Sequence, residues 1–129
     1  MCSTDQDYLP RVELRDVARV QPGYLSRTSV RSVAWGTHRL LQARDVSPQH
    51  GLRLDTVVWF KPERNPDLYR ISRGDILLTA RGQDHRACLV DIDLSNVLAS
   101  SVFYIIRPRE GVVPGYLAWW LNQPNTQDA

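Results

Sequence analysis

A short polar series between two apolar runs is the part of this sequence best suited to chemistry or recognition. The polar residues are Arg81, Gln83, Asp84, His85 and Arg86. They surround Gly82 and lie between the apolar runs 76–80 and 87–90. Glycine permits the sharp bend of a hairpin turn, so these side chains should be displayed together at a loop tip. This loop is the candidate working surface, and an ordinary solvated turn is the alternative.

A cysteine close to this loop offers the clearest route to catalysis. Cys88 follows His85 closely, and a histidine base beside a thiol is one arrangement of a nucleophilic cysteine. Cys88 lies inside an apolar run, however, where a buried structural cysteine is the commoner outcome. We expect neither a catalytic residue nor an enzyme, although an enzyme of unrecognised type stays open as an alternative.

Metal and nucleotide sites are poorly supported by the sequence. Three histidines are present, His38, His50 and His85. They lack the spacing of metal ligands. Glu63, Asp67 and Asp75 could gather around Mg²⁺, but each lies among turn-forming residues, which favours a structural role. The glycines are scattered singly, so neither a P-loop nor a dinucleotide fingerprint is present. We therefore expect no metal and no cofactor.

The basic residues are almost all arginines. The formal net charge is only +2, but of the 16 Lys and Arg residues Lys61 alone is a lysine. The planar guanidinium group suits phosphates and the guanine edge in the major groove. Arginine bias can also reflect genomic base composition, and surface arginines are commonly solvated or paired with carboxylates. The composition therefore permits nucleic-acid binding without requiring it.

Length and composition predict one globular domain. The chain has 129 residues, of which 43% are hydrophobic and 23% charged, close to the averages of globular proteins. No apolar run approaches the roughly 20 residues of a membrane span. Residues 1–5 lack the basic and apolar regions of a signal peptide. We expect a cytoplasmic location, no membrane partner and two reduced cysteines.

Apolar patterns predict a β-rich fold with a short helix near each end. Helical spacing predicts helices over 11–20 and 114–122, with Trp120 in the buried face of the second. Trp35 is expected to anchor a loop to the core. Five apolar stretches predict strands, over 39–46, 52–60, 76–80, 87–90 and 97–107. The prediction is a single α+β domain with a β-rich mixed or antiparallel sheet.

The order of several motifs resembles the target recognition domain of a type I restriction-modification specificity subunit. The motifs are VELRDVA (12–18) with Gly23, RDV (44–46), SRGDILLTARG (72–82), VLASS (97–101), IIRP (105–108) and PGYLAWWLN (114–122). The likeness covers about residues 11–124. It divides the chain into a polar lead-in at 1–10, a recognition-like domain at 11–124 and a polar tail at 125–129.

The resemblance implies recognition of double-stranded DNA without bond chemistry. Loops would enter a groove and read base edges, while basic side chains and hydroxyls would contact the backbone. The expected base-reading residues are Arg81, Gln83, His85 and Arg86. Arginine suits the guanine edge and glutamine suits the adenine edge. The expected backbone contacts are Arg27, Arg31, Arg44, Lys61, Arg64, Ser100 and Ser101.

The resemblance also implies partners. Specificity subunits normally carry two such domains joined by long helices, and they direct methyltransferase and restriction subunits to a target. This sequence contains one such domain and no long helical spacer. A lone domain, a half-subunit and a repurposed protein-interaction module stay open, and the chain could pair with a second copy of itself. An exposed apolar surface around Tyr116, Trp119 and Trp120 would favour the interaction module.

Overall fold

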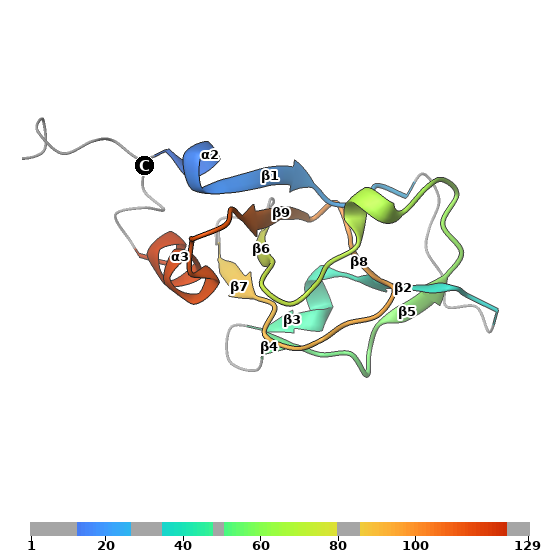
Figure 1. Cartoon of the computed structure of the whole chain (residues 1–129). Coiled ribbons are helices and arrows are strands. Elements are labelled where there is room, and N and C mark those ends of the chain that lie inside the picture. Colours follow the sequence, from blue (N-terminus) through green and yellow to red (C-terminus); the bar gives the residue numbers. More distant parts are fainter. Residues whose placement is uncertain (1–12, 27–34, 48–50, 80–85, 124–129) are drawn as a thin grey trace, which may run out of the picture.

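Short strands dominate the described part of the chain, with one short helix before them and one after. The structure is a computed structural model that describes residues 13–26, 35–47, 51–79 and 86–123 (Figure 1). Its elements are α2 (Leu14–Val17), β1 (Ala18–Pro22), β2 (His38–Leu41), β3 (Val46–Ser47), β4 (Gly51–Leu52), β5 (Val58–Phe60), β6 (Ile76–Thr79), β7 (Ala87–Leu89), β8 (Val97–Ala99), β9 (Phe103–Pro108) and α3 (Pro114–Leu121), with 3-10 helices at Ala43–Asp45 and Asp67–Tyr69. The predicted β-rich α+β fold class is confirmed.

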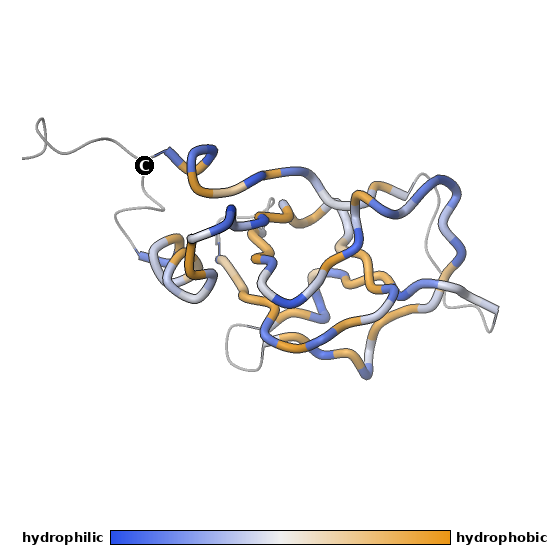
Figure 2. The backbone as a smooth tube through the Cα atoms, in the orientation of Figure 1, coloured by the Kyte–Doolittle hydropathy of each residue, from blue (hydrophilic) through white to orange (hydrophobic). Residues whose placement is uncertain are grey.

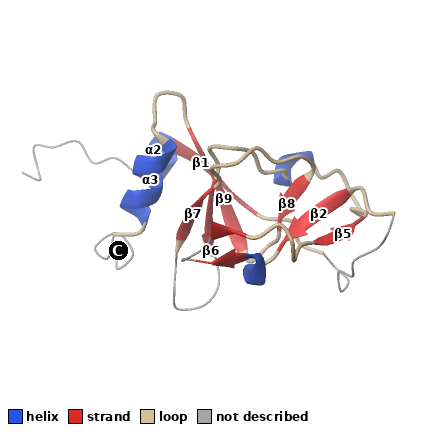
Figure 3. Ribbon diagram, turned by 90° about the horizontal axis from the view of Figure 1, so that it is seen from below, coloured by secondary structure: helices blue, strands red, loops and turns tan. Residues whose placement is uncertain are grey.

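A four-stranded antiparallel sheet brings together strands from both ends of the described chain. Its order is β1-β9-β6-β7, and its register places Val20 and Ile76 on either side of Ile106. Helices α2 and α3 lie beside this sheet at one end of the molecule (Figure 3). The side chains buried between the sheet and α3 are Ala18, Ile76, Ala87, Ile106, Leu117, Ala118 and Leu121. This apolar contact fixes α3 to the sheet.

A three-stranded sheet lies at the other end of the molecule, away from α3 (Figures 1 and 3). Its order is β5-β2-β8, with β2 antiparallel to β5 and parallel to β8. The main core joins the two sheets and contains Leu41, Ile71, Leu77, Val90, Val97, Ala99, Phe103 and Ile105. Apolar segments accordingly follow the strands through the middle of the molecule (Figure 2).

The prediction of one strand over 97–107 is wrong, because these residues form two strands that belong to different sheets. β8 ends at Ala99, the Phe103 amide donates to the Ser100 carbonyl at 3.1 Å, and β9 follows. The chain therefore passes from the three-stranded to the four-stranded sheet through one turn. Gly23 lies against this turn, where an added Cβ would be 2.0 Å from the Ser100 carbonyl oxygen. A side chain at position 23 would force this crossing apart.

Other predicted elements are shorter than expected. The helix predicted over 11–20 ends at Val17, and β1 follows at once because its backbone pairs with β9. The strand predicted over 39–46 is divided into β2, a 3-10 turn and β3, and that over 52–60 into β4 and β5. β6, β7 and α3 lie where the sequence predicts them.

Two tryptophans lie on the surface, contrary to the prediction. Trp35 is 74% exposed instead of anchoring a loop in the core. Trp120 is 37% exposed, because the sheet contacts Leu117, Ala118 and Leu121 of α3 instead. Helical spacing alone allows more than one apolar face, and the contact with the sheet decides which is buried.

One type of turn recurs before three strands. The amide of an aspartate donates to the carbonyl three residues earlier, and the aspartate carboxylate accepts the N–H of that earlier residue. The pairs are Glu13–Asp16, Gln42–Asp45 and Ser72–Asp75, with N–H to carboxylate distances of 3.0, 2.8 and 2.8 Å. Aspartate forms such turns because its short side chain reaches nearby backbone groups. The second and third directly precede β3 and β6, and Val17 alone separates the first from β1; we call them the Asp turns.

Candidate functional site

The polar loop singled out by the sequence joins β6 to β7. Arg81, Gln83 and His85 lie outside the described residues, while Arg86 is described and exposed. The hairpin closes at Thr79, whose amide donates to the Arg86 carbonyl at 3.1 Å. The four predicted base-reading residues therefore all lie in the stretch of sequence between two neighbouring antiparallel strands.

Asn122, the residue after α3, holds one end of this loop. Its side-chain oxygen accepts the N–H of Ala87, and its side-chain nitrogen donates to the Ala87 carbonyl, both at 2.8 Å. β7 is an edge strand, so these Ala87 groups have no neighbouring strand to bond. The side-chain amide of Asn122 can both donate and accept, so it bonds these groups in place of a neighbouring strand. The end of α3 is thereby fixed to the point where the loop rejoins the sheet.

Sequence reasoning did not find this role of Asn122. A polar residue after a helix is expected as the end of that helix, and nothing in the sequence marks a partner 35 positions away. The only usable signal is chemical, because asparagine can satisfy both backbone groups of an edge strand at once.

The opposite end of the hairpin is held by the Asp turn at Ser72–Asp75. Gly74 has a φ of +98°, and its amide donates to the Val90 carbonyl at 2.8 Å. The Val90 amide in turn donates to the Asp75 carbonyl at 2.8 Å. Burial raises the pKa of the Asp75 carboxyl, and the Ser72 N–H and the Arg107 guanidinium 3.8 Å away partly offset this. Both ends of the hairpin are thus tied to neighbouring segments.

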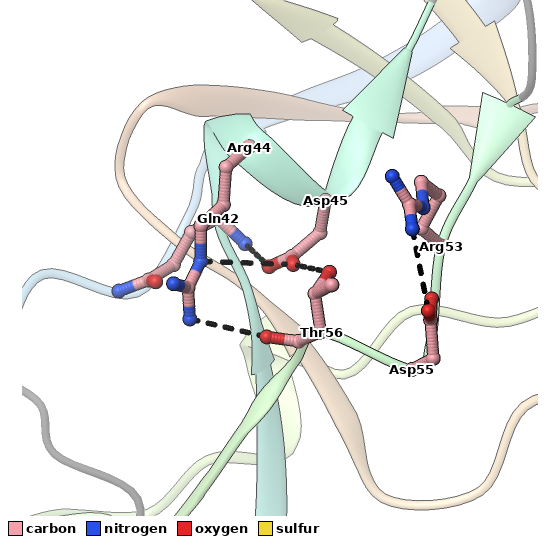
Figure 4. A network of polar contacts seen from close by, with 6 residues as sticks. All are labelled: Gln42, Arg44, Asp45, Arg53, Asp55 and Thr56. Carbon is pink, nitrogen blue, oxygen red and sulfur yellow. Dashed lines mark hydrogen bonds and ion pairs between the residues drawn. The ribbon is translucent and has the colours of Figure 1, made fainter.

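Arg44, a predicted phosphate contact, is exposed but held by a network around a buried carboxylate. Its guanidinium donates to the Thr56 carbonyl at 3.1 Å and lies 3.8 Å from Asp45 (Figure 4). Asp45 is fully buried, and it accepts the N–H of Gln42 at 2.8 Å and the hydroxyl of Thr56. These contacts hold the guanidinium group of Arg44 at the surface, where the side chain is 59% exposed.

Lys61 and Arg64 lie in the loop after β5. The Arg64 guanidinium lies over the Tyr24 ring, 4.3 Å from its centroid, and donates to the Leu25 carbonyl at 2.7 Å. Stacking on an aromatic face restricts this long side chain, so less freedom is lost when it binds an anion. Lys61 is exposed and makes no ion pair within the described residues. Both positions are compatible with contact to a DNA backbone.

The two serines predicted to contact phosphate lie at the crossing between the sheets. Ser100 is buried, and its hydroxyl has no hydrogen-bond partner in the part of the chain that the structure describes. A buried hydroxyl does not reach a surface phosphate, so we withdraw Ser100 from the predicted contacts. Ser101 is half-buried, and Arg27 and Arg31 lie outside the described residues.

The described residues contain no cluster of metal ligands, and Cys88 lies in surroundings that disfavour its thiolate. Burial raises the pKa of the Cys88 thiol, and Asp91 adds to this, so the reactive thiolate is disfavoured. Asp67 pairs with Arg70 at 3.3 Å, and Asp75 is buried in its own turn. Within ranges 13–26, 35–47, 51–79 and 86–123, no group of three His, Cys, Asp or Glu residues could hold a metal, and no helix could cross a membrane.

A second surface of interest is an exposed face of α3. Tyr116, Trp119 and Trp120 are 66%, 56% and 37% exposed, and the rings of Tyr116 and Trp119 lie 5.7 Å apart. Their i, i+3, i+4 spacing places them on one side of the helix. We call them the α3 aromatic face. An exposed cluster of large apolar side chains is typical of a contact surface for another protein.

No protein-family model matches the chain, and no curated protein matches it. Function is therefore inferred from the contacts described above and from the order of the motifs in the sequence.

Proposed function

We propose that this chain is a non-catalytic module that recognises a specific sequence in double-stranded DNA, as part of a cytoplasmic type I restriction-modification system. The anchored β6–β7 hairpin carries this proposal. Its loop contains Arg81, Gln83, His85 and Arg86. Thr79 and Asn122 hold the two sides of the loop to the sheet and to α3. Base reading benefits from such a frame, because a bidentate contact tolerates little displacement.

The basic surface would supply the part of binding that does not depend on sequence. Arg44, Lys61 and Arg64 are exposed, and Arg44 and Arg64 are held by bonds to backbone carbonyls. About half or more of the hydrogen bonds in protein–DNA complexes go to phosphate and sugar, where they set position and register. These residues would orient the domain, the loop would discriminate between bases, and methyltransferase and restriction subunits would carry out the chemistry.

The experiment is selection of bound duplexes from a random library at several salt concentrations. One short motif that stays enriched as salt rises is the expected result. Arg81→Ala should relax the preference at one base position by about 1 to 3 kcal/mol. Arg53→Ala is the matched control, since Arg53 is exposed and pairs with Asp55 at 3.3 Å. Binding without any motif, or equal weakening on all sequences by Arg81→Ala, would contradict the proposed base reading.

A protein-interaction module is the second candidate function, and the α3 aromatic face favours it. Three large exposed aromatic rings on one helix side are more apolar surface than a DNA contact requires. In this case Trp119→Ser should weaken complex formation with a methyltransferase subunit, measured by titration calorimetry with the full chain. Trp35→Ser, at the other end of the molecule, should leave that affinity unchanged. Equal effects of the two variants would argue against docking at α3.

A further inference from the structure

The guanidinium group of Arg107, near the end of β9, holds the loop that joins β5 to β6. One of its terminal nitrogens donates to the Leu68 carbonyl at 2.9 Å and to the Arg70 carbonyl at 2.8 Å. The other donates to the side-chain oxygen of Gln21 at 2.9 Å, and the Gln21 side chain itself donates to the Leu68 carbonyl. The Arg107 side chain is only 29% exposed, so water competes little for these bonds. Arginine suits this position because its planar group carries several donors in a fixed geometry.

The two carbonyls bonded by Arg107 lie on either side of Tyr69, the last residue of the 3-10 helix Asp67–Tyr69. The Tyr69 ring stands edge-on to the Tyr24 ring, and their centroids are 5.4 Å apart. Tyr24 is buried, and its hydroxyl accepts the Glu63 N–H at 2.9 Å, so Tyr24 is bonded to the same loop. The two rings therefore pack together at a position that the bonds of Arg107 help to set.

Arg64 lies against both of these rings. Its guanidinium is 4.3 Å from the Tyr24 centroid and 5.8 Å from the Tyr69 centroid. Arg64 is exposed, and its bond to the Leu25 carbonyl uses one terminal nitrogen, so other donors of the group stay available at the surface. Within the described part of the chain it forms no ion pair with a carboxylate. A long side chain held in this way loses less conformational freedom when it binds an anion.

We propose that Arg107 is a positioning residue for the DNA contact, and that it acts through Tyr69 to hold Arg64 in the conformation that binds a phosphate. This inference rests on the proposed function, in which Arg64 contacts the DNA backbone. Arg107 is half-buried and its terminal nitrogens are bonded within the chain, so it does not contact the phosphate itself. When its bonds are lost, the turn that carries Tyr69 is no longer held to β9. Arg64 then has to be immobilised anew each time DNA binds.

The first measurement is the NMR chemical shift of the Arg64 side-chain protons in the full chain without DNA. Protons above an aromatic ring are shifted upfield by its ring current, so these signals should lie upfield of those of an ordinary exposed arginine. Arg107→Lys keeps the charge but loses the planar set of donors, so the Arg64 signals should move towards the ordinary value. Gln21→Ala removes one bond from the same turn and should cause a smaller change in the same direction.

The second measurement is the affinity for a fluorescein-labelled duplex of random sequence, followed by fluorescence anisotropy, because a backbone contact does not depend on sequence. Arg107→Lys should weaken binding roughly fivefold, the order of magnitude expected when one long side chain loses its fixed conformation. In a chain that already carries Arg64→Gln, Arg107→Lys should have no further effect, because the residue that it positions is absent. A direct contact between Arg107 and DNA would instead weaken binding by the same factor in both chains, which would overturn the proposal.

Arg109→Lys is the matched control, because Arg109 directly follows β9 and also donates to a backbone carbonyl, that of Arg15 in α2. It should change neither the Arg64 signals nor the affinity for the duplex. The positioning role is overturned if the Arg64 signals do not move in Arg107→Lys, or if Arg109→Lys moves them equally. A wild-type chain that binds no duplex overturns the DNA contact itself, and the Arg64 signals distinguish that failure from a failure of Arg107 to position Arg64.

Discussion

Replacement of Asn122 by alanine tests whether α3 positions the recognition loop. The change removes two hydrogen bonds, from the Ala87 N–H and to the Ala87 carbonyl, both 2.8 Å long. It leaves the backbone amide of Asn122 bonded to the last turn of α3. A typical hydrogen bond contributes about 0.5 to 1.5 kcal/mol net, and this site is only partly buried, so the pair should contribute about 1 to 2 kcal/mol.

Amide hydrogen exchange followed by NMR measures this loss where it occurs. The Ala87 N–H faces away from β6, so Asn122 is its protecting partner in the described structure. A loss of about 1.4 kcal/mol should make Ala87 exchange roughly tenfold faster if the amide opens locally. Asn122→Asp keeps the acceptor for the Ala87 N–H but places a carboxylate oxygen against the Ala87 carbonyl, so it should not restore the wild-type exchange rate.

Gln123→Ala is the matched control, because it removes a side-chain bond to the Trp119 carbonyl at the same helix end and does not touch β7. It should leave Ala87 exchange unchanged. If the loop reads DNA, Asn122→Ala should also reduce the difference in affinity between the selected motif and a random duplex. The reasoning is refuted if Ala87 exchanges at the wild-type rate in Asn122→Ala, or if Gln123→Ala accelerates it equally.

Two further predictions concern the buried aspartates. Asp45→Ala should lower the free energy of unfolding by about 3 kcal/mol in urea denaturation, because it leaves buried donors without their acceptor. The nearby exposed Asp55→Ala should change it by less than about 0.5 kcal/mol, and equal losses would refute the role of burial (Figure 4). For Asp75 the folded-state pKa is raised above 3.8, so the folded chain holds this proton more tightly than the unfolded chain. The protonated Asp75 carboxyl therefore contributes its full stabilisation below pH 3.8, and this contribution is lost as the pH rises through the folded-state pKa. Asp75→Asn should remove this part of the dependence of the unfolding free energy on pH. An unchanged pH dependence in Asp75→Asn would contradict the prediction.

Local patterns predicted the fold class but not where strands stop. The run 97–107 is apolar throughout, and its break at Ser100 depends on β8 pairing with β2 while β9 pairs with β1 and β6. Likewise, the helix predicted over 11–20 ends at Val17 because the following residues pair with β9, which is distant in the sequence. Such breaks are set by tertiary pairing, which a local pattern does not contain.

The candidate site, too, was predicted only in part from the sequence. Turn chemistry around Gly74 and Gly82 located the hairpin, since glycine and aspartate there favour turns on each side of an apolar strand. The contact between Asn122 and Ala87 joins residues 35 positions apart, and the burial of Ser100 follows from the crossing between sheets. Residue type identified which side chains are polar, and only the structure separated exposed ones from buried ones.

The Asp turns have a consequence for the order in which the chain can fold. Each joins residues only three positions apart, so it closes at small entropic cost. The sheet contact between Gln21 and Arg107, whose side chains bond at 2.9 Å, spans 86 positions and closes far more slowly. The starts of β1, β3 and β6 can therefore be set before their distant partners arrive. We therefore expect the slow step of folding to be the pairing of β9 with β1 and β6.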